Sequence, residues 1–253
     1  YSWGDTYPLG FTPRLEGHGT DFSAVVGVKG EDLAGIGLNY DFSTSYGSNY
    51  IHYNLRNTLN LSWGPNSPHD FEIGDLQQSE TNLNADFTYP MGNMNVAFGA
   101  ESREEKYTMY RGQKEAWMAG PWGMSHLLVD PVASAAADSN VNYTAPGLAS
   151  NGMPGTSPDA AGVFARQNTA YYGDIEYDMD ALLVQAAVRF EDFSDFGTTT
   201  NFKVAGRYSL GNLATFRGGY STGFRAPTPG QSNYTGVVTS FDGLSGQQIQ
   251  EGT

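Results

Sequence analysis

The sequence predicts an all-β fold, namely an antiparallel transmembrane β-barrel segment of about nine or ten strands. Three observations lead to this prediction. Apolar and polar side chains alternate in segment after segment, these segments are about ten residues long, and short connections alternate with long ones. Strands of soluble proteins usually have about 5–6 residues, whereas a tilted strand needs about 9–11 residues to cross a bilayer.

The clearest alternation lies between residues 51 and 61. Five of the six odd-numbered positions are apolar, and all five even-numbered positions are polar. An α-helix would scatter both sets around its circumference, so the pattern predicts a strand with one apolar face. The same pattern predicts nine strands, at residues 22–28, 34–42, 51–61, 83–89, 94–100, 171–177, 182–190, 202–208 and 214–224.

Tyr and Phe stand near the ends of the predicted apolar faces, where a membrane barrel carries its interfacial aromatic girdles. A soluble sandwich or solenoid with long strands is the alternative that shows the same alternation. Strand length and aromatic placement together favour the barrel.

The connections alternate in length. Short turns are predicted at residues 90–93, 178–180 and 211–212, and longer linkers at 62–80, 105–165 and 192–199. Outer-membrane barrels have short periplasmic turns and long extracellular loops. The longest linker, 105–165, is therefore predicted to be an extracellular loop, and its part from 133 to 162, which lacks periodicity, to be a mobile surface segment.

Composition excludes several classes of protein. The 253 residues carry a net charge of −14, which argues against sequence-independent binding of nucleic acid. A hydrophobic content of 39% is low for a soluble core, and an aromatic content of 13% is high for a disordered chain. The chain has no cysteine and no apolar run long enough for a transmembrane helix. A mean hydropathy of −0.42 still suits a barrel, because only alternate residues face lipid.

The polar positions of the predicted strands carry charges of both signs, as a water-filled lumen would. These side chains either solubilise the interior and position a plug, or contact a passing solute. The predicted lumen-lining residues are Arg56, Asp86, Glu101, Arg103, Glu176, Arg189, Lys203, Arg207 and Arg217.

No catalytic or metal-binding pattern stands out. The four histidines are scattered without metal-ligand spacing, and neither a nucleophile elbow nor a phosphate-binding loop is present. The sequence therefore predicts a protein that is not an enzyme and that holds no metal or cofactor of its own.

The first part of the longest linker is rich in aromatic residues and methionines. Arg111 stands there between two tyrosines, at 107 and 110, and two tryptophans, Trp117 and Trp122. Such surfaces stack on sugars, flat chelates or the aryl rings of siderophores. They equally suit aromatic packing within the loop itself, so both interpretations remain open.

The stretch FRGGYSTGFRAPTPGQ, residues 216–231, resembles the barrel signature of TonB-dependent receptors, in which a strand ends in Gly-Phe-Arg-Ala-Pro. Residues 189–197 (RFEDFSDFG) are similar to the hairpin that precedes this signature. Residues 99–107 (GAESREEKY) are similar to a recurring segment of one large subgroup. Three such segments in the right order are more specific than Gly-Phe-Arg-Ala-Pro alone.

The resemblance implies that residues 1–253 are part of one receptor barrel of 22 strands, with a plug domain inside it. Nine or ten strands cannot close that barrel, and the sequence shows neither the plug nor the C-terminal strands, so we expect the middle of a receptor. The implied location is the cell outer membrane. The implied partners are outer-membrane lipid, the TonB–ExbB–ExbD energy complex acting through the plug, a surface lipoprotein, and a small-molecule or oligosaccharide substrate.

The orientation implied by the resemblance places the end of strand 214–224 at the cell surface. We therefore expect substrate to dock first at five residues, Arg111, Trp117, Trp122, Arg225 and Gln231.

Three function hypotheses follow. The first is an energised importer of a scarce, bulky solute such as a ferric siderophore, cobalamin or an oligosaccharide. The second is a passive porin, and the third is a surface or secreted β-rich protein used for adhesion. The Gly-Phe-Arg-Ala-Pro context favours the first.

Overall fold

The computed structural model describes residues 6–122, 149–234, 237–241 and 248–252. The chain forms one antiparallel sheet in the order β1-β2-β4-β5-β6-β7-β8-β9, with the short β3 paired to β2, and a separate β10-β11 hairpin. The strands are β1 (Arg14–Gly30), β2 (Asn39–Arg56), β3 (Phe71–Glu72), β4 (Leu76–Met91), β5 (Met94–Met109), β6 (Gly162–Met179), β7 (Leu182–Phe193), β8 (Gly197–Leu210), β9 (Ala214–Ser221), β10 (Val237–Phe241) and β11 (Gln248–Gly252). The predicted all-β, antiparallel class is confirmed.

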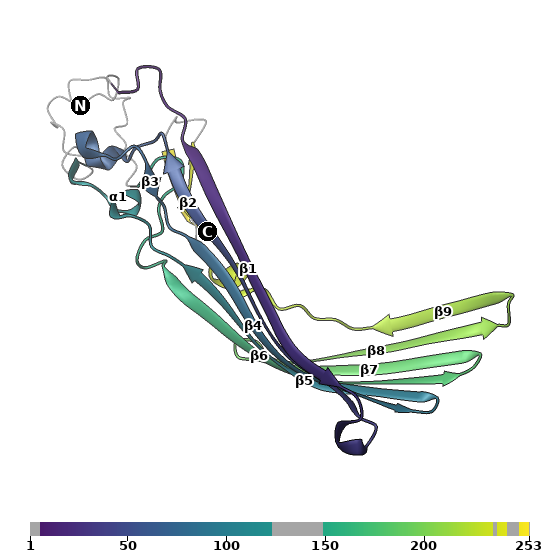
Figure 1. Cartoon of the computed structure of the whole chain (residues 1–253). Helices are drawn as coiled ribbons and strands as arrows, with labels where there is room; N and C mark the ends of the chain where they lie inside the picture. The colour runs from purple at the N-terminus through teal and green to yellow at the C-terminus, as the bar shows by residue number, and fades with distance from the viewer. Residues whose placement is uncertain (1–5, 123–148, 235–236, 242–247, 253) are drawn as a thin grey trace.

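The sheet is open and strongly curved, with β1 and β9 as its two edges (Figure 1). The turns of the β4–β5, β6–β7 and β8–β9 hairpins gather at one end, which we call the turn rim. The long connections gather at the other end, near β3 and the short helix α1 (Lys114–Trp117), and we call this end the loop rim.

Consecutive strands pair as long hairpins. The ladder between β4 and β5 runs from Leu76 opposite Met109 to Met91 opposite Met94, around a turn of Gly92 and Asn93. Gly92 has a φ of 59°, a left-handed conformation that glycine adopts without a steric penalty. The predicted short turns at 90–93, 178–180 and 211–212 are all present at the turn rim.

The prediction of two separate strands at 34–42 and 51–61 is wrong. Parts of both ranges lie in one strand, β2, which runs unbroken from Asn39 to Arg56. Before it, Leu33–Gly35 form a turn of 3-10 helix, and after it residues 57–60 leave the sheet. The prediction failed because the apolar positions change parity within the strand. They are even-numbered near Phe42 and odd-numbered near Leu55.

This change of parity recurs on β5, where Val96 and Phe98 lie on one face and Tyr107 and Met109 on the other. Side chains two residues apart on a strand, and residues directly opposite on neighbouring strands, share a face. The register therefore divides the sheet into a belt face, which carries Phe42, Phe87 and Phe98, and a charged face, which carries Asp86 and Glu101 among others.

Large apolar side chains are exposed on the belt face in the half of the sheet nearer the turn rim. They include Phe22, Val26, Val28, Phe42, Leu83, Phe98, Tyr171, Ile175, Val188, Val204, Phe216 and Tyr220. The band covers about seven to nine residues per strand. At a rise of about 3.3 Å per residue and a strand tilt of about 40°, the height of this band suits the apolar zone of an outer membrane.

Nearer the loop rim the apolar residues point to the charged face instead, because connecting segments pack there. Leu55, Phe71, Ile73 and Ala116 form a buried cluster against which Tyr53 and Met153 pack. Asn60 is fully buried at its edge. Its amide nitrogen donates to the carbonyls of Glu115 and Met118, at 2.7 and 3.2 Å, and its amide oxygen accepts from the backbone and hydroxyl of Ser62.

We call this packed unit the cap: residues 57–75, 110–122 and 149–161. The strands extend further than predicted, so the connection between β5 and β6 is 110–161 rather than 105–165. Of the segment expected to be mobile, 133–148 lies outside the described residues. The rest is packed: Ser150 donates to the Ala116 carbonyl, Asn151 to that of Leu59 and Thr156 to that of Ile73. The predicted linker at 192–199 is also wrong, since only residues 194–196 separate β7 from β8.

The chain after β9 runs back across the middle of the sheet (Figure 1). The strand predicted to continue to residue 224 ends at Ser221, and the helix α4 (Pro229–Asn233) packs on β5 and β6. No helix in the described ranges is long and apolar enough to span a membrane.

Candidate functional site

Eight of the nine predicted lumen-lining residues share the charged face. Asp86 lies opposite Gly99, Arg189 opposite Tyr172, and Lys203 opposite Ala187, which links β4 through β8 into one surface. The residues on this surface are Asp86, Glu101, Arg103, Glu176, Arg189, Lys203, Arg207 and Arg217.

Arg56 is the exception and corrects the prediction. It lies opposite Arg14 and on the other face from Leu55, because β2 is continuous and the parity of its apolar residues changes. Its Nε donates to Glu16 at 2.7 Å, and its Nη1 lies 3.6 Å from Asp70. Arg56 therefore forms a surface ion-pair cluster at the loop rim, outside the charged surface.

The charged face holds a hollow of ≈ 660 Å³ toward the loop rim. Its walls come from β4 to β8, and residues 223–228 border it on the way from β9 to α4. The charged groups that line it are Glu80, Glu101, Arg103, Glu105, Arg166, Arg189, Glu191 and Arg225. Phe193 and Phe224 add aromatic surface, so the hollow offers charges of both signs beside apolar rings.

Arg189 organises the floor of the hollow. Its Nη2 donates to Glu101 at 2.8 Å and to Glu191 at 3.2 Å. Glu191 also accepts from the amide of Asn168 at 3.3 Å. Each of these two carboxylates is thereby paired with Arg189 on the wall.

Four buried side-chain atoms on the charged face have no hydrogen-bond partner among the described residues: Oδ1 of Asn82, Nε of Arg103, Oδ1 of Asn168 and Oγ1 of Thr199. Arg103 and Asn168 lie directly opposite each other on β5 and β6, and Nε of Arg103 is 4.0 Å from Oε1 of Glu101. A hydroxyl group both accepts and donates a hydrogen bond, so it satisfies Nε of Arg103 and Oδ1 of Asn168 at once. The wall is therefore suited to a polar solute with hydroxyl groups or to bound water.

The five residues expected at the docking point separate into two groups. Arg225 is exposed and lines the hollow. Gln231 lies a few residues further on, but its side-chain oxygen accepts from the backbone of Thr228 at 2.9 Å and completes the capping box of α4. In the structure Gln231 thus fixes the local turn.

Arg111, Trp117 and Trp122 belong to the cap and do not line the hollow. Arg111 is exposed, Trp117 donates from its indole to the carbonyl of Gly112 at 3.1 Å, and Trp122 packs against Gly64. The two tryptophans are half-buried against the backbone of the cap itself.

The sequence analysis missed Arg166 and Glu105, which are opposite each other on β6 and β5 and are buried. Glu105 is the first residue of the linker predicted at 105–165 and Arg166 directly follows its last residue, in a stretch where no strand was expected. Continuing the alternation of 94–100 by a few residues would have placed Glu105 on the charged face.

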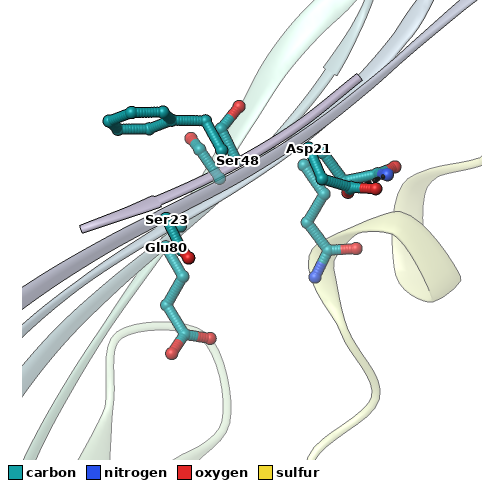
Figure 2. A pocket seen from close by; sticks show the side chains of 9 residues that line it. Asp21, Ser23, Ser48 and Glu80 are labelled. Carbon is teal, nitrogen blue, oxygen red and sulfur yellow. Dashed lines mark hydrogen bonds between the residues drawn. The ribbon is translucent and has the colours of Figure 1, made fainter. Parts of the chain in front are cut away.

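A second hollow, of ≈ 480 Å³, lies at the edge formed by β1, β2 and β4. Figure 2 shows the sheet nearly edge-on there, with Ser48 on one side and Ser23 and Glu80 on the other. Because its lining residues stand on both faces, it is an open sheet edge and not one cavity. Over the described residues, no cluster of three or more His, Asp or Glu could hold a metal ion.

Comparison with known proteins identifies the family. The family model described as TonB dependent receptor-like, beta-barrel matches residues 1–253. No curated protein matches the chain. A porin whose structure was refined at 1.8 Å is similar at 12% identity and a TM-score of 0.33, over 73% of this chain and 54% of its own length. The chain belongs to the TonB-dependent receptor β-barrel family, a family of outer-membrane transporters and not of enzymes, and its location is the outer membrane.

Proposed function

We propose that this chain forms part of the wall of an energised importer, which takes up a scarce, bulky solute and receives its energy from the TonB–ExbB–ExbD complex through a plug domain. The belt face contacts outer-membrane lipid, the charged face lines the lumen, and the cap lies on the extracellular side. A surface lipoprotein that delivers solute to the cap is a further proposed partner.

The observation that carries the proposal is the segment between β9 and α4, which crosses the charged face beside the hollow. A segment lying across the lumen narrows it, and the family match favours a receptor over a passive porin. A receptor that binds solute before moving it gains a bordered site from the same arrangement.

The hollow supports a solute with polar groups and some apolar surface. Arg103 in the hollow and the buried Asn168 beside it offer a donor and an acceptor for a hydroxyl, Arg225 offers an exposed cation, and Phe193 and Phe224 offer rings. Ferric siderophores, cobalamin and oligosaccharides all combine these features, so the proposal covers this group of solutes. We propose Arg225 as the principal docking residue, with Arg111, Trp117 and Trp122 contacting solute earlier on the cap.

The test is uptake by cells that express the full-length protein, using ferric siderophores, cobalamin and maltodextrins with and without a protonophore. The proposal expects uptake of one of these solutes that stops when the proton gradient collapses and is absent without TonB. Uptake that persists under the protonophore, together with ion conductance of the purified protein in planar bilayers, would establish the porin alternative. Recovery of the protein in the soluble or secreted fraction would instead point to the adhesion alternative.

A further inference from the structure

A buried arginine joins the wall to the segment that crosses it. We call residues 222–233 the strap. Arg166, on β6, is only 3% exposed, and Glu105 opposite it on β5 is 6% exposed. Nε of Arg166 donates to Oε2 of Glu105 at 2.9 Å, and Nη2 donates to the same oxygen. This pair belongs to the wall alone.

The remaining arm of the guanidinium reaches the strap. Nη1 of Arg166 donates to the carbonyl oxygen of Pro227 at 2.5 Å and lies 3.8 Å from Asp195. The guanidinium also lies over the rings of Phe193 and Phe196, at 5.5 and 5.6 Å from their centroids. A desolvated guanidinium in this setting forms strong hydrogen bonds and cation–π contacts.

The strap adds an aromatic contact of its own to the same point. The ring of Phe224 meets those of Phe193 and Phe196 edge-on, with centroid distances of 6.1 and 6.5 Å. Arg166 and Phe224 thus both hold the strap against the same two rings, Phe193 and Phe196.

Two other points fix the ends of the strap. At its start, the backbone of Thr222 donates to the carbonyl of Phe202, and its hydroxyl accepts from the backbone of Phe202. At its end, Pro229 is buried and Gly230 lies against the ring of Tyr107. Between these ends, the bond from Arg166 to Pro227 is the one hydrogen bond to the wall that residues 223–228 make within the described part of the chain.

The strap is stiff between its fixed ends. Pro227 and Pro229 restrict the residues that precede them to extended conformations, and the capping box at Thr228 sets the start of α4. Between its fixed ends the strap is held to the wall by the Arg166 hydrogen bond and the Phe224 ring contacts, so loss of either one loosens residues 223–228. Gly223, Arg225 and Ala226, which border the hollow, are among these residues.

We propose that Arg166 is a positioning residue that latches the strap onto the wall, and that release of the latch opens the hollow and withdraws Arg225 from it. The latch is a property of the wall and stands apart from the identity of the solute and from the energy source.

The test uses an engineered thiol, because the chain has no cysteine. Ala226→Cys places a probe on the strap, and a membrane-impermeant maleimide measures its exposure in outer membranes that contain the full-length protein. In the Arg166→Gln background we expect labelling about tenfold faster or more, as for loss of one charge-assisted hydrogen bond. Arg166→Lys should label at an intermediate rate, because one ammonium group cannot replace the planar fork that serves Glu105 and Pro227 together.

Two further variants keep the test decisive. Arg207→Gln is the matched control, since Arg207 is on the same face but near the turn rim, 3.8 Å from Asp178. Its labelling rate should equal that of the parent. Phe224→Ala removes the aromatic contact and leaves the buried Arg166–Glu105 pair intact. If the Arg166→Gln protein does not assemble, this variant still tests whether the strap is held to the wall. Faster labelling is expected in this variant too.

Equal labelling rates in the parent, Arg166→Gln and Phe224→Ala backgrounds would overturn the latch, as would equal acceleration by Arg207→Gln. Labelling needs neither solute nor proton gradient, so it separates failure of the latch from failure of the proposed import.

Discussion

Phe42 and Leu55 lie on opposite faces of one continuous strand, β2, although each belongs to the apolar set of the alternating pattern around it. Phe42 is 40% exposed on the belt face, whereas Leu55 is 2% exposed beneath the cap. The strand therefore passes through two environments: lipid against its outer side near the turn rim, and a packed cap against its inner side near the loop rim.

The first prediction concerns the edge of the lipid band. Phe98→Arg and Thr108→Arg change two residues on the same face of β5, one inside the band and one beyond it. An arginine on the lipid face costs about 2–4 kcal/mol at the bilayer midplane and about 0–1 kcal/mol near the interface. Urea unfolding in lipid vesicles should show a loss of about that size for Phe98→Arg and almost none for Thr108→Arg. Equal losses would place the boundary elsewhere.

The second prediction concerns the cap. Asn60→Ala removes the amide that donates to the carbonyls of Glu115 and Met118 and accepts from Ser62, and of the two carbonyls only that of Met118 keeps a described partner, the indole of Trp63. Each unpaired group costs about 1–3 kcal/mol, so we expect local opening of the cap to become easier by about 2–4 kcal/mol. Hydrogen exchange at residues 113–118 measures this. Asn212→Ala, at the exposed turn of the opposite rim, is the control and should change nothing there.

The third prediction concerns acid. Burial raises the pKa of Asp75, but hydrogen bonds from Tyr50, His52 and the backbone of Tyr53 outweigh it, so the pKa lies below the ordinary 3.8. The contribution of Asp75 to the free energy of unfolding is therefore fully present above the unfolded-state pKa of about 3.9. It is lost as the pH falls through the lower pKa of the folded state. The unfolding midpoint of Asp75→Asn should fall less than that of the parent below about pH 4. Parallel curves would show that Asp75 does not contribute.

The fourth prediction concerns solute binding. Arg225→Ala removes an exposed cation from the border of the hollow without breaking a hydrogen bond to the wall that the structure describes. For an anionic or strongly polar solute, loss of one charge-assisted contact corresponds to about 1.5–3 kcal/mol, or roughly ten- to a hundredfold in Kd. Equilibrium binding of the solute that uptake identifies measures the change. Arg217→Ala, on the same face near the turn rim, should bind like the parent.

The part of the fold nearest the membrane could be predicted from the sequence, because lipid imposes a simple alternation on every strand that crosses it. The turns at 90–93 and 211–212 and eight of the nine charged residues follow from that alternation alone. Arg56 was placed on the wrong face for the same reason: the alternation was assumed to keep its phase, and it does so only while one environment lies on each side.

The cap and the strap could not be predicted, because they depend on contacts between residues far apart in the sequence. Asn60 is a buried hub only because residues 113–118 come to rest on it. Arg166 is a latch only because Pro227 lies across it. In the sequence Asn60 is a polar position of a predicted strand and Arg166 directly follows a predicted linker, and polarity at either place carries no information about burial.

The most direct test of the account is a scan of single cysteines along β5 in outer membranes containing the full-length protein, each labelled with an environment-sensitive fluorophore. The account predicts an apolar signal at positions 96, 98 and 100, a polar signal at 97 and 99, and a polar signal again at 104, 106 and 108 on the belt face. An alternation that continues in the same phase to 108, or no alternation at all, would contradict both the lipid band and the placement of the cap.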